Sequence, residues 1–324
     1  LQQQATYPVR PMVCGSSCKL PRGVNAVPSL GRAVSVACDL VLEVPTLRWG
    51  AGGTPAELAA GVARRIRHGA FVDAAQLFDH IIFGISFAEA AATDPQQRLV
   101  LEHSYTALHA MGLAKSSLLG SGIGVSVGIY AIEFANVLAQ SPAISSVYAS
   151  TGASLSIACG RVSFVLGMQG PCASIETACS ASLVACHSAA HAVQHHECDL
   201  HLVAGVNLML LQASSAGVAI AGMTSPTGRS HTFDSREDGF ARGEGVSTLA
   251  MLSGAGLVGV RGSAVQQDGR SASLTAPNGQ AQQGLLRTAL ADTNVTSDAL
   301  TLNEAHGTGT PLGDPIEARS LGTA

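Results

Sequence analysis

The stretch GPCASIETACSASLVACHSAAHAV, residues 170–193, decides how the rest of this sequence is interpreted. Small residues lead into Cys179, and small or apolar residues then recur at helical spacing as far as Val193. We therefore expect Cys179 at or near a helix start, where backbone N–H groups and the helix dipole favour a thiolate. A single cysteine is ordinarily a buried structural residue, but the small-residue turn around this one favours a nucleophile.

A second stretch, NEAHGTGTPLGDPIEA at residues 303–318, places a histidine in a turn of glycines and threonines. His306 could polarise a carbonyl or support an enolate through its ring N–H. On its own, a histidine in a glycine-rich turn is more often an ordinary loop residue. The two stretches lie far apart in the sequence, so Cys179 and His306 would meet only through folding.

Together the two stretches resemble the motifs of the β-ketoacyl synthases, the condensing enzymes of modular polyketide synthases and fatty acid synthases. That family carries a TACSSSL-like motif, whose cysteine accepts an acyl chain, and a later HGTGT motif. Glu176 stands where the family usually has Asp, and we interpret it as a conservative change that supports the Cys179 turn. The resemblance begins at about Val9 and is interrupted at residues 50–69, where a short Ala/Gly/Arg segment replaces the family's acidic and aromatic run.

The resemblance implies a role for each matching residue. Cys179 would take an acyl group from the phosphopantetheine arm of an acyl carrier protein, and His306 would assist decarboxylation of a malonyl-type extender. The carbanion would then attack the acyl thioester in a Claisen condensation. Thr308 and Thr310 match positions that hydrogen-bond the pantetheine arm, and Glu304 matches a carboxylate that pairs with a later lysine.

The implied activity is that of an acyltransferase of the 3-oxoacyl-[acyl-carrier-protein] synthase type. Its partners would be the carrier protein and acyl and malonyl-type thioesters. No cofactor is expected to be bound permanently, because the carrier protein supplies the phosphopantetheine. A thiolase or an initiation-type condensing enzyme would use cysteine and histidine differently, and the pairing of TACSAS with HGTGT argues against both.

The family's later KSNxGH motif and FGG loop do not occur before the sequence ends at Ala324. We therefore expect a C-terminally truncated ketosynthase. An alternative stays open: a module that keeps the synthase shape and binds acyl groups and carrier protein, but cannot elongate because the second histidine is missing.

The pattern of strands and helices predicts an α/β fold. Residues 122–129 and 199–211 are apolar and rich in β-branched residues, which is typical of buried strands. The Asp94–Pro95 pair predicts the start of a helix, with Asp at the N-cap and Pro at the first helical position. The resemblance adds a thiolase-like architecture of two related halves with layered sheets and helices, the second half incomplete.

The same resemblance suggests how the chain is divided. Residues 1–8 are expected to be a linker, residues 9–255 the N-terminal half of the ketosynthase, and residues 256–324 part of its C-terminal half. It also implies a homodimer formed through a sheet edge.

Composition limits the other possibilities. The chain has 324 residues, of which 47% are hydrophobic and 12% charged, as expected for a compact protein with a sizeable core. A net charge of −4 does not indicate a surface that binds nucleic acid. The sequence contains no run of eighteen apolar residues, so no membrane span is predicted. Eight irregularly spaced cysteines favour reduced thiols and a cytoplasmic enzyme, although a targeting segment could precede Leu1.

No metal site is predicted. Cys14 and Cys18 form a CxxxC pair, but no second pair follows at ligand spacing. His187, His191 and His195 share one helix face, yet no carboxylate lies at ligand spacing from them. A solvated helix face is the favoured interpretation of these histidines.

Overall fold

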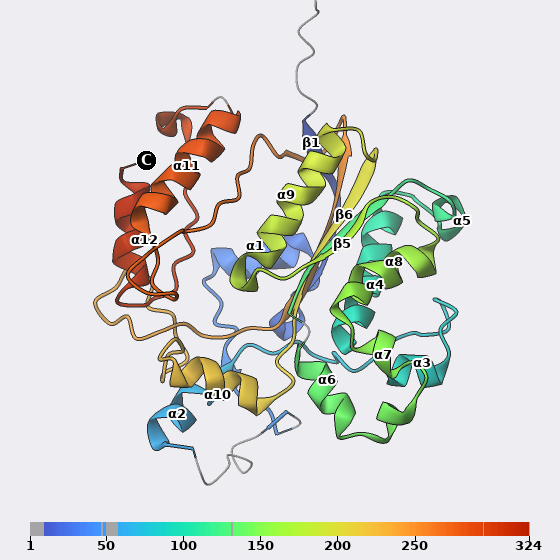
Figure 1. Ribbon diagram of the computed structural model, residues 1–324, viewed down its shortest axis with the longest axis horizontal. Helices are drawn as coiled ribbons and strands as arrows, with labels where there is room; N and C mark the ends of the chain where they lie inside the picture. The colour runs from blue at the N-terminus through green and yellow to red at the C-terminus, as the bar shows by residue number, and fades with distance from the viewer. Residues whose placement is uncertain (1–9, 47, 50–57, 131, 294, 324) are drawn as a thin grey trace, which may run out of the picture. The chain divides into compact units, whose positions relative to one another are not determined.

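The computed structural model describes residues 10–46, 48–49, 58–130, 132–293 and 295–323 (Figure 1). The chain forms two compact units. The first comprises Leu1–Cys38, Val72–Leu208 and Gly245–Val260, and the second comprises Asp39–Phe71, Met209–Glu244 and Arg261–Ala324. Among the described residues, none of the helices has both the length and the apolar character needed to cross a membrane.

The first unit is built on a six-stranded sheet with the order β5-β4-β6-β7-β1-β8. Strands β5, β4 and β6 run parallel to one another, whereas β7 is antiparallel to β6 and to β1. The strands predicted within residues 122–129 and 199–211 are confirmed as β4 and β6, although β6 ends at Asn207 and residues 208–211 are not part of it. The strands are β1 (Pro11–Lys19), β4 (Gly124–Ile129), β5 (Cys172–Ile175), β6 (Leu200–Asn207), β7 (Gly245–Ser253) and β8 (Val258–Gly259).

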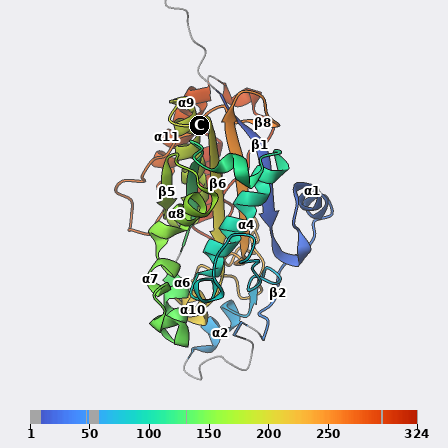
Figure 2. The same cartoon turned by 90° about the vertical axis from the view of Figure 1, so that its right-hand side faces the viewer.

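Helices cover both faces of this sheet (Figures 1 and 2). Helix α9 (Ala181–Gln194) lies on one face, and α4 (Pro95–Ala110) and α8 (Leu155–Leu166) lie on the other. The alanine-rich sequence of α9 allows close packing, because Ala185 and Ala189 are fully buried against Val203 and Met251. Burial on both faces explains why β4 and β6 are apolar along their length.

Helix α4 begins where the sequence predicts. The Asp94 carboxylate accepts a hydrogen bond from the backbone N of Gln96 at 2.8 Å, and Pro95 occupies the first helical position. Burial raises the pKa of Asp94 to about 6, although the hydrogen bonds from Gln96 oppose the shift. The buried Gln96 amide also donates to the Tyr130 carbonyl and accepts from the Leu208 N, both at 3.0 Å, so it joins three segments of the first unit.

Shorter elements complete the first unit. They are the helices α1 (Val27–Ser35), α3 (Phe87–Ala91), α5 (Lys115–Leu118), α6 (Ile132–Ala139) and α7 (Ala149–Gly152), and 3-10 turns at Pro21–Gly23, Pro142–Ser145 and Ala178–Ser180.

The second unit contains the small sheet of β2 (Leu42–Glu43) and β3 (His68–Gly69), and the helices α2 (Ala60–Arg65), α10 (Gln212–Ile220), α11 (Gly279–Thr293) and α12 (Gly313–Leu321). A buried carboxylate ties its segments together. Glu244 accepts from the Arg48 guanidinium and from the Met209 N, both at 2.9 Å. A buried charge is costly unless it is paired, so breaking these bonds would be unfavourable. They therefore hold Arg48 and Met209 against Glu244, at the end of the 222–245 loop.

Candidate active site

Cys179 lies in a tight turn between a strand and a helix of the first unit. Strand β5 ends at Ile175, a 3-10 turn spans Ala178–Ser180, and α9 follows at once. Ala178 has φ +54°, a left-handed conformation that non-glycine residues rarely adopt. The Ser180 hydroxyl donates to the carbonyl and hydroxyl oxygens of Thr177, both at 2.9 Å, and closes the turn. Cys179 lies at the start of α9, as the sequence predicts, and the structure adds that it is exposed.

Two glycines let this helix start lie directly on the sheet. Gly128 of β4 and Gly205 of β6 are neighbours across the parallel strand pair. A Cβ atom on Gly128 would lie 2.6 Å from the backbone of Ala181 and Ser182, and one on Gly205 would lie 2.3 Å from the Ser182 hydroxyl oxygen. The neighbours of Gly128 are backbone atoms, so only hydrogen fits there, whereas the neighbour of Gly205 is a side chain. The two glycines together set how closely the Cys179 turn approaches the sheet.

A buried histidine lies under the same helix. His201 of β6 bonds to the Ser126 hydroxyl at 2.9 Å and to the Cys198 sulfur at 3.3 Å. Its side chain is 2% exposed, and burial lowers its pKa to about 4. The ring is therefore neutral at physiological pH, and its bond to Ser126 joins β6 to β4.

The turn that carries His306 belongs to the second unit and is held by carboxylates of α12. Glu317 accepts from the backbone N of His306 at 2.6 Å and of Gly307 at 2.8 Å. Asp314, which is buried, accepts from the N of Gly309 at 2.9 Å. Both glycines have positive φ, which any residue with a Cβ would adopt only with strain. Three backbone donors of the turn are thus satisfied by two acidic side chains.

The same turn packs against the long loop at residues 222–245. The Thr232 hydroxyl donates to the Gly307 carbonyl at 2.6 Å, and the Gly239 N donates to the Gly309 carbonyl at 2.9 Å. The second oxygen of Asp314 accepts from the backbone N of Phe233 at 2.6 Å. Asp314 therefore anchors the loop and the histidine turn at once.

The structure places the other predicted residues as follows. The hydroxyls of Thr308 and Thr310 are 3.0 Å apart, and the Thr310 oxygen also accepts from the Gly313 N at 3.2 Å. Glu304 lies exposed just before the histidine, and Glu176 lies exposed just before the Cys179 turn.

His306, Glu304 and the two threonines are thus together in the second unit, while Cys179 and Glu176 belong to the first. The meeting of Cys179 with His306 stays a prediction. Sequence reasoning assigned no role to Asp314 and Glu317, although two acidic residues three apart at the start of a helix are typical of side chains that bind backbone N–H groups.

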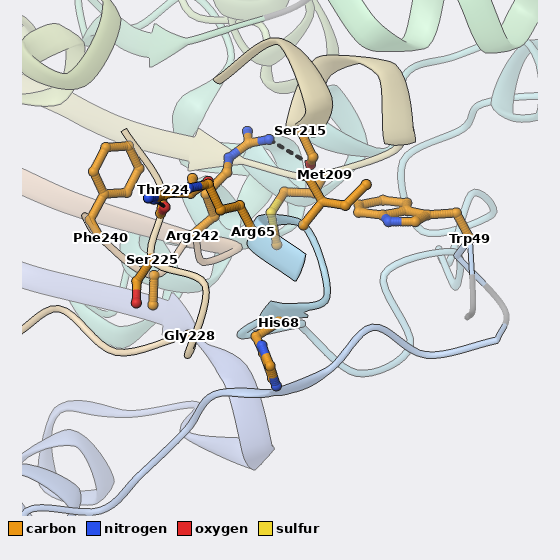
Figure 3. Close-up of a pocket in the computed structure, with 12 residues that line it drawn as sticks. Trp49, Arg65, His68, Met209, Ser215, Thr224, Ser225, Gly228, Phe240 and Arg242 are labelled. Atoms are coloured by element: carbon orange, nitrogen blue, oxygen red, sulfur yellow. Dashed lines mark hydrogen bonds between the residues drawn. The ribbon is translucent and has the colours of Figure 1, made fainter. Parts of the chain in front are cut away.

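A pocket in the second unit does not offer a substrate site (Figure 3). It is lined by Trp49, Arg65, His68, Arg242 and other side chains, and a hydrogen bond of 2.8 Å joins Arg242 to Ser215. Its free volume is about 10 Å³, which is room for one water molecule. Burial lowers the pKa of His68, whose Nδ1 has no hydrogen-bond partner in the structure. This pocket is packed protein interior.

Family models match almost the whole chain. The N-terminal domain of β-ketoacyl synthases matches residues 10–255, and the C-terminal domain of the same family matches residues 257–324. The chain belongs to the β-ketoacyl synthase family. The family predicted from the two motifs is therefore confirmed.

Curated relatives of this synthase are polyketide synthases. It is 39% identical over 336 residues to a mycocerosic acid synthase-like polyketide synthase of Mycolicibacterium smegmatis. It is 44% identical over 331 residues to a phenolphthiocerol synthesis polyketide synthase type I of Mycobacterium bovis. Each match covers 99% of the chain but only 16% and 15% of the relative's length. The chain is therefore similar to a small part of each of these polyketide synthases.

Solved ketosynthases share its fold. The ketosynthase from module 6 of the bacillaene synthase of Bacillus subtilis matches with a TM-score of 0.88 at 30% identity, covering 96% of this chain and 54% of its own. An oxazolomycin ketosynthase domain of Streptomyces albus matches with a TM-score of 0.86 at 28% identity, covering 98% and 56%. The synthase thus spans about half the length of these solved chains, and the predicted thiolase-like α/β fold is confirmed.

Proposed function

We propose that this domain catalyses decarboxylative Claisen condensation, as a 3-oxoacyl-[acyl-carrier-protein] synthase with Cys179 as the acyl acceptor. Membership of the β-ketoacyl synthase family, with an exposed cysteine at the start of α9, carries the proposal. The family matches do not favour the alternative of a non-elongating binding module.

In the first step, the Cys179 thiolate attacks the acyl thioester on the phosphopantetheine arm of a carrier protein. The carbon–sulfur bond to the pantetheine breaks, the pantetheine thiol leaves, and the acyl group is held on Cys179. The N–H groups at the start of α9 favour the thiolate before attack, because the helix dipole is positive there.

In the second step, a malonyl-type thioester loses carbon dioxide, and the electron pair of the broken bond forms an enolate. The enolate carbon attacks the acyl carbon on Cys179, so a carbon–carbon bond forms and the thiolate leaves. His306 would stabilise the enolate oxygen through its ring N–H, and such a group contributes about 10²–10⁴-fold. This step requires Cys179 and His306 to face one substrate.

The remaining residues and partners belong to the same proposal. Thr308 and Thr310 bind amide groups of the pantetheine arm, and Glu304 and Glu176 support the histidine turn and the cysteine turn. The partners are an acyl carrier protein, which brings the phosphopantetheine, and a second copy of the chain, joined through an edge of the six-stranded sheet. The outer strands of that sheet, β5 and β8, are where such pairing could occur.

The test is acyl transfer from an acyl-loaded carrier protein, followed by peptide mass spectrometry. We expect one acyl group on Cys179, its loss in Cys179→Ala, and no change in Cys38→Ser, which removes another exposed thiol. Addition of a malonyl-loaded carrier protein should then yield a β-ketoacyl product. Acylation of Cys172 or Cys186 in preference to Cys179 would contradict the proposal.

A further inference from the structure

The second unit contains a cavity beside Trp49 that is much larger than the packed one described above. Its volume is about 360 Å³, which is in the range of small-molecule sites. We call it the Arg64 pocket, and its polar lining residues are Glu43, Trp49, Arg64, Arg67 and Gln212. All of them belong to the second unit, so the pocket is a feature of one compact unit.

The rest of the lining is apolar. Val44, Ala63 and Ile66 line the pocket together with the Trp49 ring, and Ile66 is buried. The Trp49 ring contacts Phe71 edge to face, with ring centroids 6.0 Å apart, which restrains it. Apolar surface that a ligand covers is removed from water, so this lining favours a ligand with a hydrocarbon part.

Three arginines lie in α2 or just after it, and the structure uses two of them. The Arg65 guanidinium donates to the Asp238 carbonyl at 2.9 Å. Arg67 forms an ion pair of 2.9 Å with Glu43. Within the described part of the chain, Arg64 makes neither a hydrogen bond nor an ion pair. Two cations and one carboxylate therefore give the pocket a net charge of +1, and the Arg64 charge is the one left without a partner.

Two buried donors of the same pocket also lack acceptors. Neither Trp49 Nε1 nor Gln212 Nε2 has a hydrogen-bond partner among the described residues. A buried indole N–H usually has a partner, and a buried donor without one costs free energy. Water could satisfy such donors singly, but it would neither neutralise Arg64 nor cover the apolar lining. The complement of these donors is a group that only accepts hydrogen bonds, such as an ionised carboxylate.

We propose that the Arg64 pocket binds an amphiphilic carboxylate, a monoanion that carries a hydrocarbon chain. Its oxygens accept from the Arg64 guanidinium and from the N–H groups of Trp49 and Gln212, and its chain covers the apolar lining. Hydrogen bonds between a guanidinium and a carboxylate are charge-assisted and therefore strong. A monoanion matches the net charge of the pocket, whereas a dianion would leave one charge unpaired near Glu43. The pocket shares no residue with the proposed condensation site, so ligand binding and condensation can be tested independently.

The test uses octanoate and the fluorescence of Trp49, which is the only tryptophan in the sequence. Octanoate is titrated into the whole chain below the concentration at which it forms micelles. We expect a saturable change in Trp49 fluorescence and a matching heat of binding in isothermal titration calorimetry. Octanol lacks the charge and acetate lacks the chain, so each should bind at least about tenfold more weakly. Binding of octanol or acetate as tight as that of octanoate, or heat of binding without a change in fluorescence, would overturn the proposal.

Two variants separate the contributions of the lining. Arg64→Gln should weaken octanoate binding about tenfold and leave octanol binding unchanged, because the charge is removed. Arg32→Gln is the matched control, since Arg32 is an exposed arginine in the last turn of α1, as Arg64 is in α2. It should bind octanoate as the wild type does. The proposal fails if Arg64→Gln binds octanoate as tightly as Arg32→Gln does.

The second variant, Gln212→Leu, distinguishes a ligand contact from a structural role. It removes a buried donor that has no acceptor, so the urea midpoint without ligand should stay the same or rise. Octanoate binding should nevertheless weaken, because one donor to the carboxylate is lost. A lower urea midpoint with unchanged octanoate affinity would assign Gln212 a structural role and contradict the proposed contact.

Discussion

A methyl group added at Gly128 would collide with the start of α9, and we expect the collision to slow the acylation of Cys179. The added Cβ would lie 2.6 Å from the carbonyl carbon of Ala181 and from the backbone N of Ser182. Because carbon atoms attract best at about 3.5–4.0 Å, the first turn of α9 would have to move by roughly 1 Å. The atoms that the new Cβ would meet belong to the backbone of Ala181 and Ser182, which cannot rotate away as a side chain could.

The expected losses of stability and of acylation rate both follow from that displacement. Overpacking of a buried contact costs about 1–3 kcal/mol, so Gly128→Ala should lower the free energy of unfolding by that amount. A catalytic group misplaced by about 1 Å can lose up to about 10²-fold in rate, and we expect acylation of Cys179 to fall about 10- to 100-fold. Urea unfolding and single-turnover acylation, followed by intact-protein mass spectrometry, measure the two effects separately.

The chain offers matched controls for this variant. Gly160 lies in α8, and a Cβ there would meet nothing within 4 Å, so Gly160→Ala should keep the acylation rate and stabilise the helix slightly. Gly205→Ala meets the mobile Ser182 hydroxyl, and adding Ser182→Ala should relieve part of its effect. The reasoning is refuted if Gly128→Ala acylates and unfolds as Gly160→Ala does.

Three further predictions concern other parts of the two units. Replacing Thr308 and Thr310 together with Val should weaken acyl transfer from a carrier protein about tenfold, yet leave labelling of Cys179 by iodoacetamide unchanged; equal loss in both assays would indicate a disturbed fold. Glu317→Gln weakens the charge-assisted bonds to the His306 turn, so condensation should fall while acyl loading persists; an equal fall in loading would contradict this. The pKa of His201 is about 4 in the folded state and about 6.5 in the unfolded state, so the unfolded state binds a proton first as the pH falls. Neutral His201 therefore contributes up to about 3 kcal/mol to the free energy of unfolding above pH 6.5, and this contribution is lost as the pH falls towards 4. Urea unfolding between pH 4.5 and 7 should show a flatter slope in His201→Gln, and an unchanged slope would assign the effect to other groups.

Local signals in the sequence predicted the elements whose causes are local. The Asp94–Pro95 pair marked the start of α4 because an N-cap and its first turn lie within a few residues. The apolar runs marked β4 and β6 because burial on both faces is visible in composition. The two motifs that pointed to the family were equally compact.

Features that depend on long-range register could not be predicted in this way. Gly128 and Gly205 matter because they are neighbours across β4 and β6, and no sequence pattern gives that register. Asp314 was visible in the motif, but its bond to Phe233 arises only when the 222–245 loop folds against it.

The position of β1 in the sheet has a consequence for synthesis on the ribosome. β1 emerges before the other strands of its sheet, yet it pairs with β7, about 240 residues later. At a translation rate of about 5–20 residues per second, roughly 10–50 s pass before β7 is made. During that interval β1 is a nascent strand whose N–H and C=O groups lack their native partners, and such strands pair readily with other chains. Holdase chaperones that bind β1 during that interval should therefore raise the yield of folded protein more than chaperones that act after β7 is made.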